Sequence, residues 1–387
     1  MQIVRVSNRG ARRWTARQHP WIYRSDLIEP APGPPGAVRV LDERGRIIGS
    51  ALWSPASAIS LRMLTADDRA VDAEFWHDRI EQALAYRNGL APDANAYRLV
   101  HAEADGLPSL IVDRYGEHLV VQLLSAGLET FRADILSALI DLLGPQGILA
   151  RHDASVREHE RLPRTNELLY GSVPEGIEVH EAGVRYEAAP WTGQKTGAFL
   201  DQRENRVRAG ELARGRALDV FAYHGSFTLH LATRATDVLA VDSSAEALAR
   251  ATENFRRNAF THVRCIEANA FDLLRAEETA GRRWDIIVLD PPAFAKRRDA
   301  VARALGGYKE INLRALRLLA PGGHLLTFSC SYHVDVASFT AMLEDAAADA
   351  GRTVRWIESR WQSSDHPRVV QIPETSYLKG AILQAVD

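Results

Sequence analysis

The chain has 387 residues, of which 46% are hydrophobic and 25% are charged, and its formal net charge is −3. This composition is typical of a globular protein with two or three domains, and no run approaches the roughly 18 apolar residues of a membrane span. The N-terminus lacks the apolar core of a signal peptide, and the two cysteines, Cys265 and Cys330, lie far apart. We therefore expect a cytoplasmic protein with neither a disulfide framework nor a bound metal.

The first 65 residues are strongly basic. They contain ten arginines and four acidic residues, a net charge of +6, so the rest of the chain carries −9. Clustered arginine can neutralise nucleic-acid phosphates, although a solvated basic face gives the same pattern. The whole chain has 43 arginines and four lysines, a ratio that a genomic bias in composition also explains.

Residues 1–68 are predicted to form a small β domain and residues 69–188 an α+β middle domain. In the first, short strand-like segments bounded by Gly and Pro occur at 3–6, 37–41, 47–51 and 59–64. In the second, helical periodicity alternates with strand-like segments. Helices are predicted at 74–88 and 131–143, and strands are predicted at 97–102, 109–113, 118–124, 148–151 and as a pair near 176–188. Nothing in the middle domain has the spacing of a catalytic site.

Residues 189–387 are predicted to form an α/β domain with a parallel sheet. Its first strand ends in a tight turn at 223–226, and its second ends at Asp242. Such a turn lets backbone N–H groups approach a ligand, and an acid at the second strand tip can accept both ribose hydroxyls. Because the turn contains only Gly225, where a dinucleotide fold would have G-x-G-x-x-G, NAD and FAD are disfavoured. A nucleoside without phosphates, such as S-adenosylmethionine, makes a weaker demand.

Further strands are predicted at 265–271, 284–290 and 324–331. The order of the five segments resembles the class I S-adenosylmethionine-dependent methyltransferases. A wider set of motifs is similar to the bacterial large-subunit ribosomal RNA 5-methylcytosine methyltransferases: K-T-G-A-F-L-D-Q-R-E-N-R at 195–206, D-P-P-A-F at 290–294, G-Y-K-E-I-N at 307–312 and F-S-C-S at 328–331. The resemblance covers nearly the whole chain. It implies a Rossmann-like catalytic domain, an N-terminal PUA-like RNA-binding barrel, S-adenosylmethionine as cofactor, and 23S ribosomal RNA or a large-subunit precursor as partner. A homodimer is considered beside the monomer.

The resemblance also implies a cofactor site. Asp219 and the Gly225 turn would hold the methionine part of the cofactor, Asp242 the ribose, and Asn269 with Ala270 the adenine. The commoner family pattern has Asp where this chain has Asn269, and Asp242 could instead cap the helix that follows it. The full predicted set is Phe199, Asp219, Phe221, Tyr223, Gly225, Ser226, Asp242, Ser243, Asn269, Ala270, Asp290 and Pro291.

Cys330 and Asp290 are the predicted catalytic residues. C5 of cytosine becomes nucleophilic when a thiolate adds to C6, and Cys330 ends the fifth strand of the pattern in a polar setting. Asp290 would bind the N3/N4 edge of the base. In contrast, we interpret Cys265, inside an apolar strand, as a buried structural residue. Residues 194–206 are predicted to be a lid over the cofactor, the alternative being a helix N-terminus with solvated charges.

The predicted RNA contacts are Arg9, Arg12, Arg13, Arg24, Lys296 and Arg297, whereas Trp21 and Tyr23 are expected to pack the barrel. The last two strands of the sheet are predicted between Asp365 and Gly380. Two other functions remain open. The Asp290-Pro291-Pro292 turn is also typical of nitrogen methyltransferases, and the chain could be a non-catalytic RNA-binding assembly factor.

Overall fold

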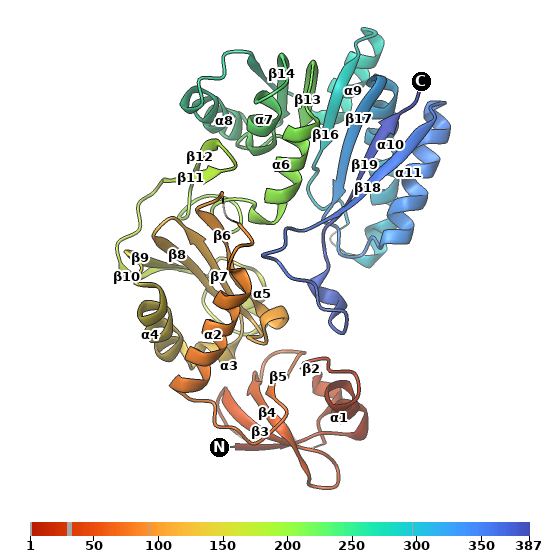
Figure 1. Ribbon diagram of the computed structural model, residues 1–387. Coiled ribbons are helices and arrows are strands. Elements are labelled where there is room, and N and C mark those ends of the chain that lie inside the picture. Colours follow the sequence, from red (N-terminus) through yellow and green to blue (C-terminus); the bar gives the residue numbers. More distant parts are fainter. Residues whose placement is uncertain (1, 29–32, 92, 296) are drawn as a thin grey trace. The chain divides into compact units, whose positions relative to one another are not determined.

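Contacts along the chain group the residues into two units, each drawn from three separate stretches of sequence. The computed structural model describes residues 2–28, 33–91, 93–295 and 297–387 (Figure 1). The first unit is Met1–Val179, Ala188–Leu200 and Ser364–Ser376; the second is His180–Glu187, Asp201–Ser363 and Tyr377–Asp387. No helix in the described part combines the length and the apolarity that crossing a membrane requires.

The N-terminal part of the first unit is a five-stranded sheet in the order β1-β3-β4-β5-β2. Its strands are β1 (Gln2–Arg5), β2 (Trp21–Ile22), β3 (Gly36–Leu41), β4 (Ile47–Trp53) and β5 (Leu61–Thr65). Two short helices complete it, α1 (Asn8–Thr15) and the 3₁₀ turn η1 (Arg24–Asp26). The sequence did not predict α1. The Ser7 side chain caps α1 by accepting the N–H of Gly10 at 3.2 Å, which satisfies one of the free donors of the first turn.

A second sheet in the first unit has the order β10-β9-β8-β7-β6. Its strands are β6 (Ala96–His101), β7 (Leu110–Tyr115), β8 (His118–Leu123), β9 (Gly147–Arg151) and β10 (Asn166–Gly171). The helical elements are α2 (Ala73–Arg87), η2 (Ala102–Asp105), α3 (Ala126–Glu129), α4 (Arg132–Leu143) and α5 (Val156–His159). Helices α2 and α4 bury Phe75, Ile80 and Leu139 in one core with the sheet. The helices and strands predicted for this region are present, and β10 is additional.

The second unit contains a seven-stranded sheet in the order β15-β14-β13-β16-β17-β19-β18. Its strands are β13 (Arg216–Val220), β14 (Asp237–Asp242), β15 (Val263–Glu267), β16 (Trp284–Leu289), β17 (Leu319–Ser329), β18 (Val354–Trp361) and β19 (Lys379–Ala385). The first five strands pair in parallel, and β19 is antiparallel to both of its neighbours. Strand order therefore reverses between β13 and β16, which is the point where open α/β sheets bind ligands.

Both faces of this sheet are covered, which explains why its central strands contain uninterrupted apolar runs such as Ile286–Leu289. Leu218, Ile287 and Leu289 face one core, and Ala217, Ile286 and Val288 face the other. The helical elements are η3 (Leu200–Gln202), α6 (Arg203–Leu212), α7 (Ser226–Ala232), α8 (Ala245–Arg257), α9 (Ala270–Thr279), η4 (Arg298–Ala300), α10 (Val301–Leu318) and α11 (Val336–Ala350). The predicted fold class, a Rossmann-like α/β domain with a small N-terminal β domain, is confirmed.

Strand β15 is an edge strand of this sheet, so one prediction about it needs correction. Cys265 is only half-buried, and its sulfur lies 3.6 Å from the Thr252 hydroxyl on α8. An edge strand has a neighbour on one side only, so its side chains cannot all enter the core.

A hairpin precedes α6, formed by β11 (Ile177–Glu181) and β12 (Val184–Ala188). At its turn, the buried Glu181 carboxylate accepts hydrogen bonds from Arg206 on α6 at 2.6 and 2.7 Å, and His230 on α7 lies 2.9 Å away. Burial raises the pKa of Glu181, but the Arg206 guanidinium and the His230 hydrogen bond outweigh it and leave the pKa lowered. The carboxylate therefore stays charged and ties the hairpin to α6 and α7.

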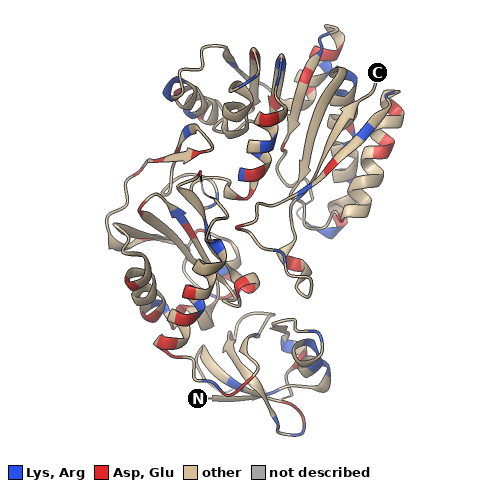
Figure 2. Cartoon of the chain, viewed as in Figure 1, with Lys and Arg blue, Asp and Glu red and all other residues tan. Residues whose placement is uncertain are grey.

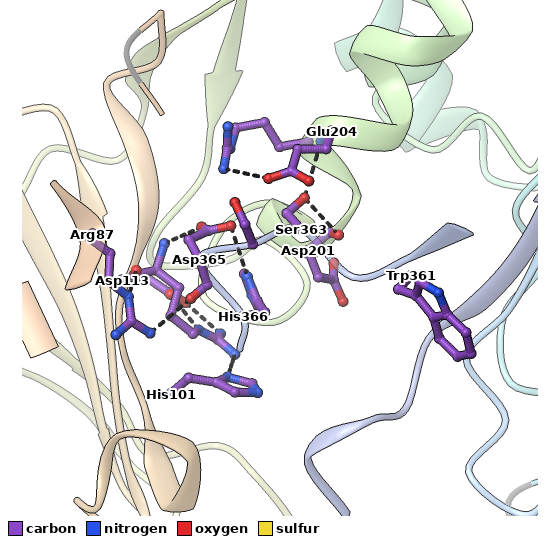
Figure 3. Close-up of polar contacts among 12 residues, drawn as sticks. Arg87, His101, Asp113, Asp201, Glu204, Trp361, Ser363, Asp365 and His366 are labelled. Carbon is purple, nitrogen blue, oxygen red and sulfur yellow. Dashed lines mark hydrogen bonds and ion pairs between the residues drawn. The ribbon is translucent and has the colours of Figure 1, made fainter. Parts of the chain in front are cut away.

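The prediction for the C-terminal strands was wrong. The strands lie at β18 and β19, and residues 364–376 between them belong to the first unit, with only η5 (Pro373–Thr375) regular. Polar contacts inside that unit hold this segment, as Figure 3 shows: the Arg98 N–H donates to the buried Asp365 carboxylate at 2.8 Å, and Arg87 donates to the Asp365 carbonyl at 2.9 Å. Side-chain anchoring and two prolines thus replace strand pairing here.

Candidate active site

Four of the predicted site regions meet at one edge of the second unit's sheet. The turn at 221–225 follows β13, Asp242 ends β14, Asp290 follows β16 and Cys330 follows β17. The register aligns Val220 with Leu289 and Leu289 with Thr327, so the carboxyl ends of these parallel strands lie side by side. The strand reversal between β13 and β16 places this edge at the switch point of the sheet.

The turn after β13 has an unusual backbone. Phe221, Tyr223 and Gly225 have φ angles of 71°, 50° and 82°, a region that side chains disfavour. The N–H groups of Phe221 and Ala222 both donate to the Val241 carbonyl at 2.9 Å, which turns the chain across the end of β14. A Cβ at 225 would lie 2.7 Å from the Phe255 ring, so the single glycine of the motif is required sterically.

Asp242 is fixed between this turn and the start of α8. One carboxylate oxygen accepts the N–H of Tyr223 at 2.9 Å, and the other accepts the N–H of Ser244 at 2.9 Å. The helix cap is Ser244, which accepts the N–H of Ala247 at 3.2 Å, so Asp242 precedes the cap. Ser243 beside it is exposed. A carboxylate held in this way is oriented in advance for a hydroxyl donor.

Asp219 is the buried acid of the site. Its carboxylate accepts a hydrogen bond of 2.6 Å from the Thr228 hydroxyl. Burial, together with the negative charges of Asp290 and Asp242, raises its pKa to about 7. Three carboxylates are therefore close enough to interact, and such a cluster favours a cationic ligand, whose charge would relieve their repulsion.

Asp219→Asn should make stability less dependent on pH. Because the pKa of Asp219 is raised from its ordinary value of 3.8 to about 7 in the folded protein, its contribution to stability is present in acid and is lost as the pH rises through 7. The amide avoids this loss, on the order of 2–4 kcal/mol, and its oxygen can still accept from Thr228. Thermal unfolding of the ligand-free proteins at about pH 5 and about pH 8 measures this. An equal fall in both melting temperatures would contradict it.

Asp290 is held by the start of α6. Gln202 donates to its carboxylate at 2.9 Å, and Asn205 donates to the Gln202 side-chain oxygen at 2.6 Å. The alternative prediction for residues 194–206 was a helix N-terminus whose charged side chains face solvent. It is wrong at the start of α6, where these polar side chains are buried: Asp201, Gln202, Arg203, Asn205 and Arg206.

The same region is fixed by backbone contacts. The Ser363 hydroxyl donates to the Asp201 carbonyl at 3.0 Å and accepts the N–H of Glu204 at 3.1 Å (Figure 3). Phe199 belongs to the first unit, where the Lys195 ammonium lies 4.5 Å from its ring centroid. A lid role for residues 194–206 stays a prediction.

Cys330 is half-buried just past the end of β17, and its sulfur lies 3.9 Å from the Pro291 carbonyl oxygen. The next residue, Ser331, is buried, and its hydroxyl lies 2.9 Å from the Tyr308 hydroxyl and accepts the Ala295 N–H at 3.1 Å. These contacts join the ends of β16 and β17 with α10. They fix the backbone on both sides of the position from which the thiol projects.

Phe294 and Asn269, which lie near the predicted site, both have contacts within the fold. Phe294 packs beside Tyr308, with ring centroids 4.6 Å apart, and also contacts Phe221 and Phe271. Asn269 caps α9, its side-chain oxygen accepting the N–H of Phe271 at 2.9 Å, and Ala270 is the buried first residue of that helix. One lone pair of the Asn269 oxygen is therefore already used in the folded chain.

The predicted RNA-binding arginines differ in their surroundings. Arg9 and Arg13 donate to the buried Asp26 carboxylate at 2.5 and 3.2 Å, and Arg24 donates to backbone carbonyls of Pro55 and Ser57. Arg12 is exposed, and no described acceptor lies within hydrogen-bonding distance of it. Arg297 pairs with Asp299, and Lys296 lies outside the described residues. Figure 2 shows basic residues on α1.

Comparisons with known proteins agree with this geometry. A family model described as S-adenosylmethionine-dependent methyltransferase matches residues 142–379, and one described as PUA-like domain matches residues 4–66. "Ribosomal RNA large subunit methyltransferase I" of Tolumonas auensis is 42% identical over 382 residues, covering 96% of each chain. The protein with the same name from Shewanella amazonensis is 41% identical, covering 95% of each chain.

One solved structure matches the whole chain in fold. The crystal structure of SMU.776 complexed with SAH has a TM-score of 0.85 and 20% sequence identity, and the match covers 99% of this chain and 100% of that chain. At this identity the likeness concerns the fold alone.

Proposed function

Because the chain belongs to the ribosomal RNA large-subunit methyltransferase I family of S-adenosylmethionine-dependent methyltransferases, we propose that it methylates C5 of a cytosine in 23S ribosomal RNA or in a large-subunit precursor. Cys330 is the nucleophile and Asp290 binds the base. The name of the relatives supports large-subunit ribosomal RNA as the substrate. The position of Cys330 at the carboxyl edge of the sheet supports C5 of cytosine as the methylated atom.

The proposed reaction explains why a cysteine is needed. C5 of cytosine is too weak a nucleophile to accept a methyl group directly. Addition of the Cys330 thiolate to C6 forms a sulfur–carbon bond and moves electron density to C5. That carbon attacks the methyl group of S-adenosylmethionine, whose sulfonium–methyl bond breaks as S-adenosylhomocysteine leaves. A base removes the C5 proton, and the sulfur–carbon bond then breaks, which returns the thiolate and releases 5-methylcytosine.

The observation that carries the proposal is the pairing of Cys330 with the Asp290 turn. The Cys330 sulfur is 3.9 Å from the Pro291 carbonyl, and Asp290 directly precedes that proline. Gln202 holds the Asp290 carboxylate in one orientation. A thiol and a fixed carboxylate at neighbouring strand ends can bind one base together, the carboxylate on its N3/N4 edge and the sulfur at C6.

The cofactor contacts follow from the same edge of the sheet. The carboxylates of Asp219, Asp242 and Asp290 suit a donor that carries a sulfonium and an ammonium charge. In the proposal, Asp242 and Ser243 take the ribose, Asn269 and Ala270 the adenine, and Pro291 the reacting end. The turn residues Phe221, Tyr223, Gly225 and Ser226 wrap the methionine part.

RNA binding is proposed to use α1 and the turn that follows it, in which Arg17 lies. Replacing Arg12 and Arg17 by alanine should weaken RNA binding at low salt, because both are exposed and have no described anionic partner that offsets their charge. Each lost phosphate contact should also lower the slope of log affinity against log salt by about one. Binding titrations at several salt concentrations measure both effects. Arg256→Ala, an exposed arginine on α8 paired with Glu253, is the control, and an unchanged slope in the double variant would contradict the proposal.

The Asp290-Pro291-Pro292 turn favours one other function, methylation of a base nitrogen. The two reactions are separated by incubating the protein with unmodified large-subunit RNA and methyl-labelled S-adenosylmethionine, followed by digestion to nucleosides. Label in 5-methylcytidine supports the cysteine mechanism. Label in an N-methylated nucleoside would remove Cys330 from the mechanism and make Asp290 the centre of the site.

A further inference from the structure

One lysine is buried beside the proposed nucleophile. Lys379 is the first residue of β19, opposite Ser329 of β17 in the antiparallel register, and is only 6% exposed. Its ammonium group donates a hydrogen bond of 2.7 Å to the carbonyl oxygen of Ser331, the residue directly after Cys330. The side chain therefore reaches past the end of its own strand to the backbone that carries the thiol.

The surroundings of this ammonium lack a close anion. Among the residues that the structure describes, no carboxylate lies within 4 Å of the Lys379 nitrogen, although nearly every other buried cation there has one. Burial lowers the pKa of Lys379 to about 8, while Cys330 and Asp335 act to raise it. A buried charge is costly unless an anion compensates it. The Cys330 sulfur interacts electrostatically with the Lys379 ammonium and becomes such an anion when it ionises.

We infer that Lys379 is a positioning residue that stabilises the thiolate of Cys330. The inference rests on the proposed function, in which Cys330 attacks C6 as a thiolate. The ammonium favours the charged form of the sulfur, and its bond to Ser331 holds the backbone next to it. A positive charge near a thiol lowers the pKa of the thiol and so increases the reactive fraction near neutral pH.

Tyr308, Asp335 and Asp290, described titratable groups near the thiol, do not take this role. Tyr308 on α10 senses the Cys330 charge, but burial raises its pKa, so it remains a neutral hydroxyl at neutral pH. Asp335 lies before α11 and caps it by accepting the Ser338 N–H at 2.7 Å, and its pKa is lowered by that bond. Asp290 on the β16 side is a carboxylate and would oppose a thiolate. Lys379 supplies the compensating positive charge.

The test compares the two cysteines of the same molecule. Iodoacetamide alkylates thiolates, so the rate of labelling of each cysteine peptide, followed by mass spectrometry against pH, gives the pKa of each thiol. Lys379→Met should raise the Cys330 midpoint by about one pH unit or more and slow its labelling at neutral pH about tenfold. Lys379→Arg keeps the positive charge, so its Cys330 midpoint should stay close to that of the wild type. Cys265, on the edge strand beside Thr252, should be unchanged in every variant.

An unchanged Cys330 midpoint in Lys379→Met with normal thermal unfolding would overturn the inference. If that variant does not fold, Lys379→Gln gives the same comparison with a side chain that can still donate to Ser331. The labelling needs neither RNA nor methyl donor. If labelled 5-methylcytidine forms and the midpoint stays constant, the role of Lys379 fails alone. If the midpoint shifts and the product is an N-methylated nucleoside, the proposed function fails and the lysine–thiol pair stands.

Discussion

Replacing Cys330 by alanine is expected to reduce methyl transfer to large-subunit RNA by a thousandfold or more, on the order expected for removing a covalent nucleophile. Without the sulfur, no adduct at C6 can form and C5 does not become nucleophilic. The affinity for S-adenosylmethionine, measured by calorimetry, should change little, because the methyl donor is proposed to contact the neighbouring strand ends. The measurement is the rate of label transfer under single-turnover conditions.

Cys265→Ala is the matched control for this experiment. Cys265 is the other cysteine of the chain and lies on the edge strand β15, so the variant should keep the wild-type rate. RNA containing 5-fluorocytosine provides a second measurement, since fluorine at C5 cannot leave as a proton and the adduct should persist in the wild type. A Cys330→Ala protein that still methylates RNA at the normal rate would exclude the thiolate mechanism and favour methylation of a nitrogen.

Asp242→Ala is expected to weaken S-adenosylmethionine binding about a hundredfold or more, because each hydrogen bond to a charged group contributes about 1.5–3 kcal/mol. The carboxylate would lose its contacts to the ribose, and the turn after β13 would lose the bond from the Tyr223 N–H that fixes it. Calorimetric titration of the RNA-free protein measures the affinity directly.

The other end of the same strand offers the control. Asp237 begins β14 and pairs with Arg216 and Arg264 at the surface. Asp237→Ala removes a carboxylate of the same kind, and it should leave the affinity within about threefold, because exposed ion pairs contribute little. Equal affinity of the Asp242→Ala protein and the wild type would show that the ribose is bound elsewhere.

The sheet of the second unit was the most predictable part of the fold. Runs such as Ile286–Leu289 are buried on both faces, and a strand covered on both sides is nearly continuously apolar. Helix α1 was not predicted, because it is only eight residues long and Ala11 and Trp14 are its only apolar side chains. The C-terminal strands were misplaced because Tyr377 and Leu378 have strand propensity, whereas the pairing that decides the matter begins at Lys379.

The candidate site was predicted in outline and not in its supporting contacts. Residues that follow parallel strands must share one edge, so the proximity of Asp242 and Asp290 follows from chain order alone. The contact of Gln202 with Asp290 and that of Lys379 with Ser331 join residues 88 and 48 positions apart. Such contacts depend on the register of β19 and the path of η3, which no local pattern encodes. None of the sequence motifs that indicate the family contains Lys379.

The division of the chain into interleaved stretches has a genetic consequence. The backbone passes from one unit to the other at 179/180, 187/188, 200/201, 363/364 and 376/377. Neither unit can therefore be encoded by one uninterrupted gene fragment, and a stop codon before residue 376 shortens both units at once. A stop after residue 363 would remove the Asp365 anchor from the first unit and β19 with Lys379 from the second. A single continuous fragment of the gene therefore carries neither unit whole.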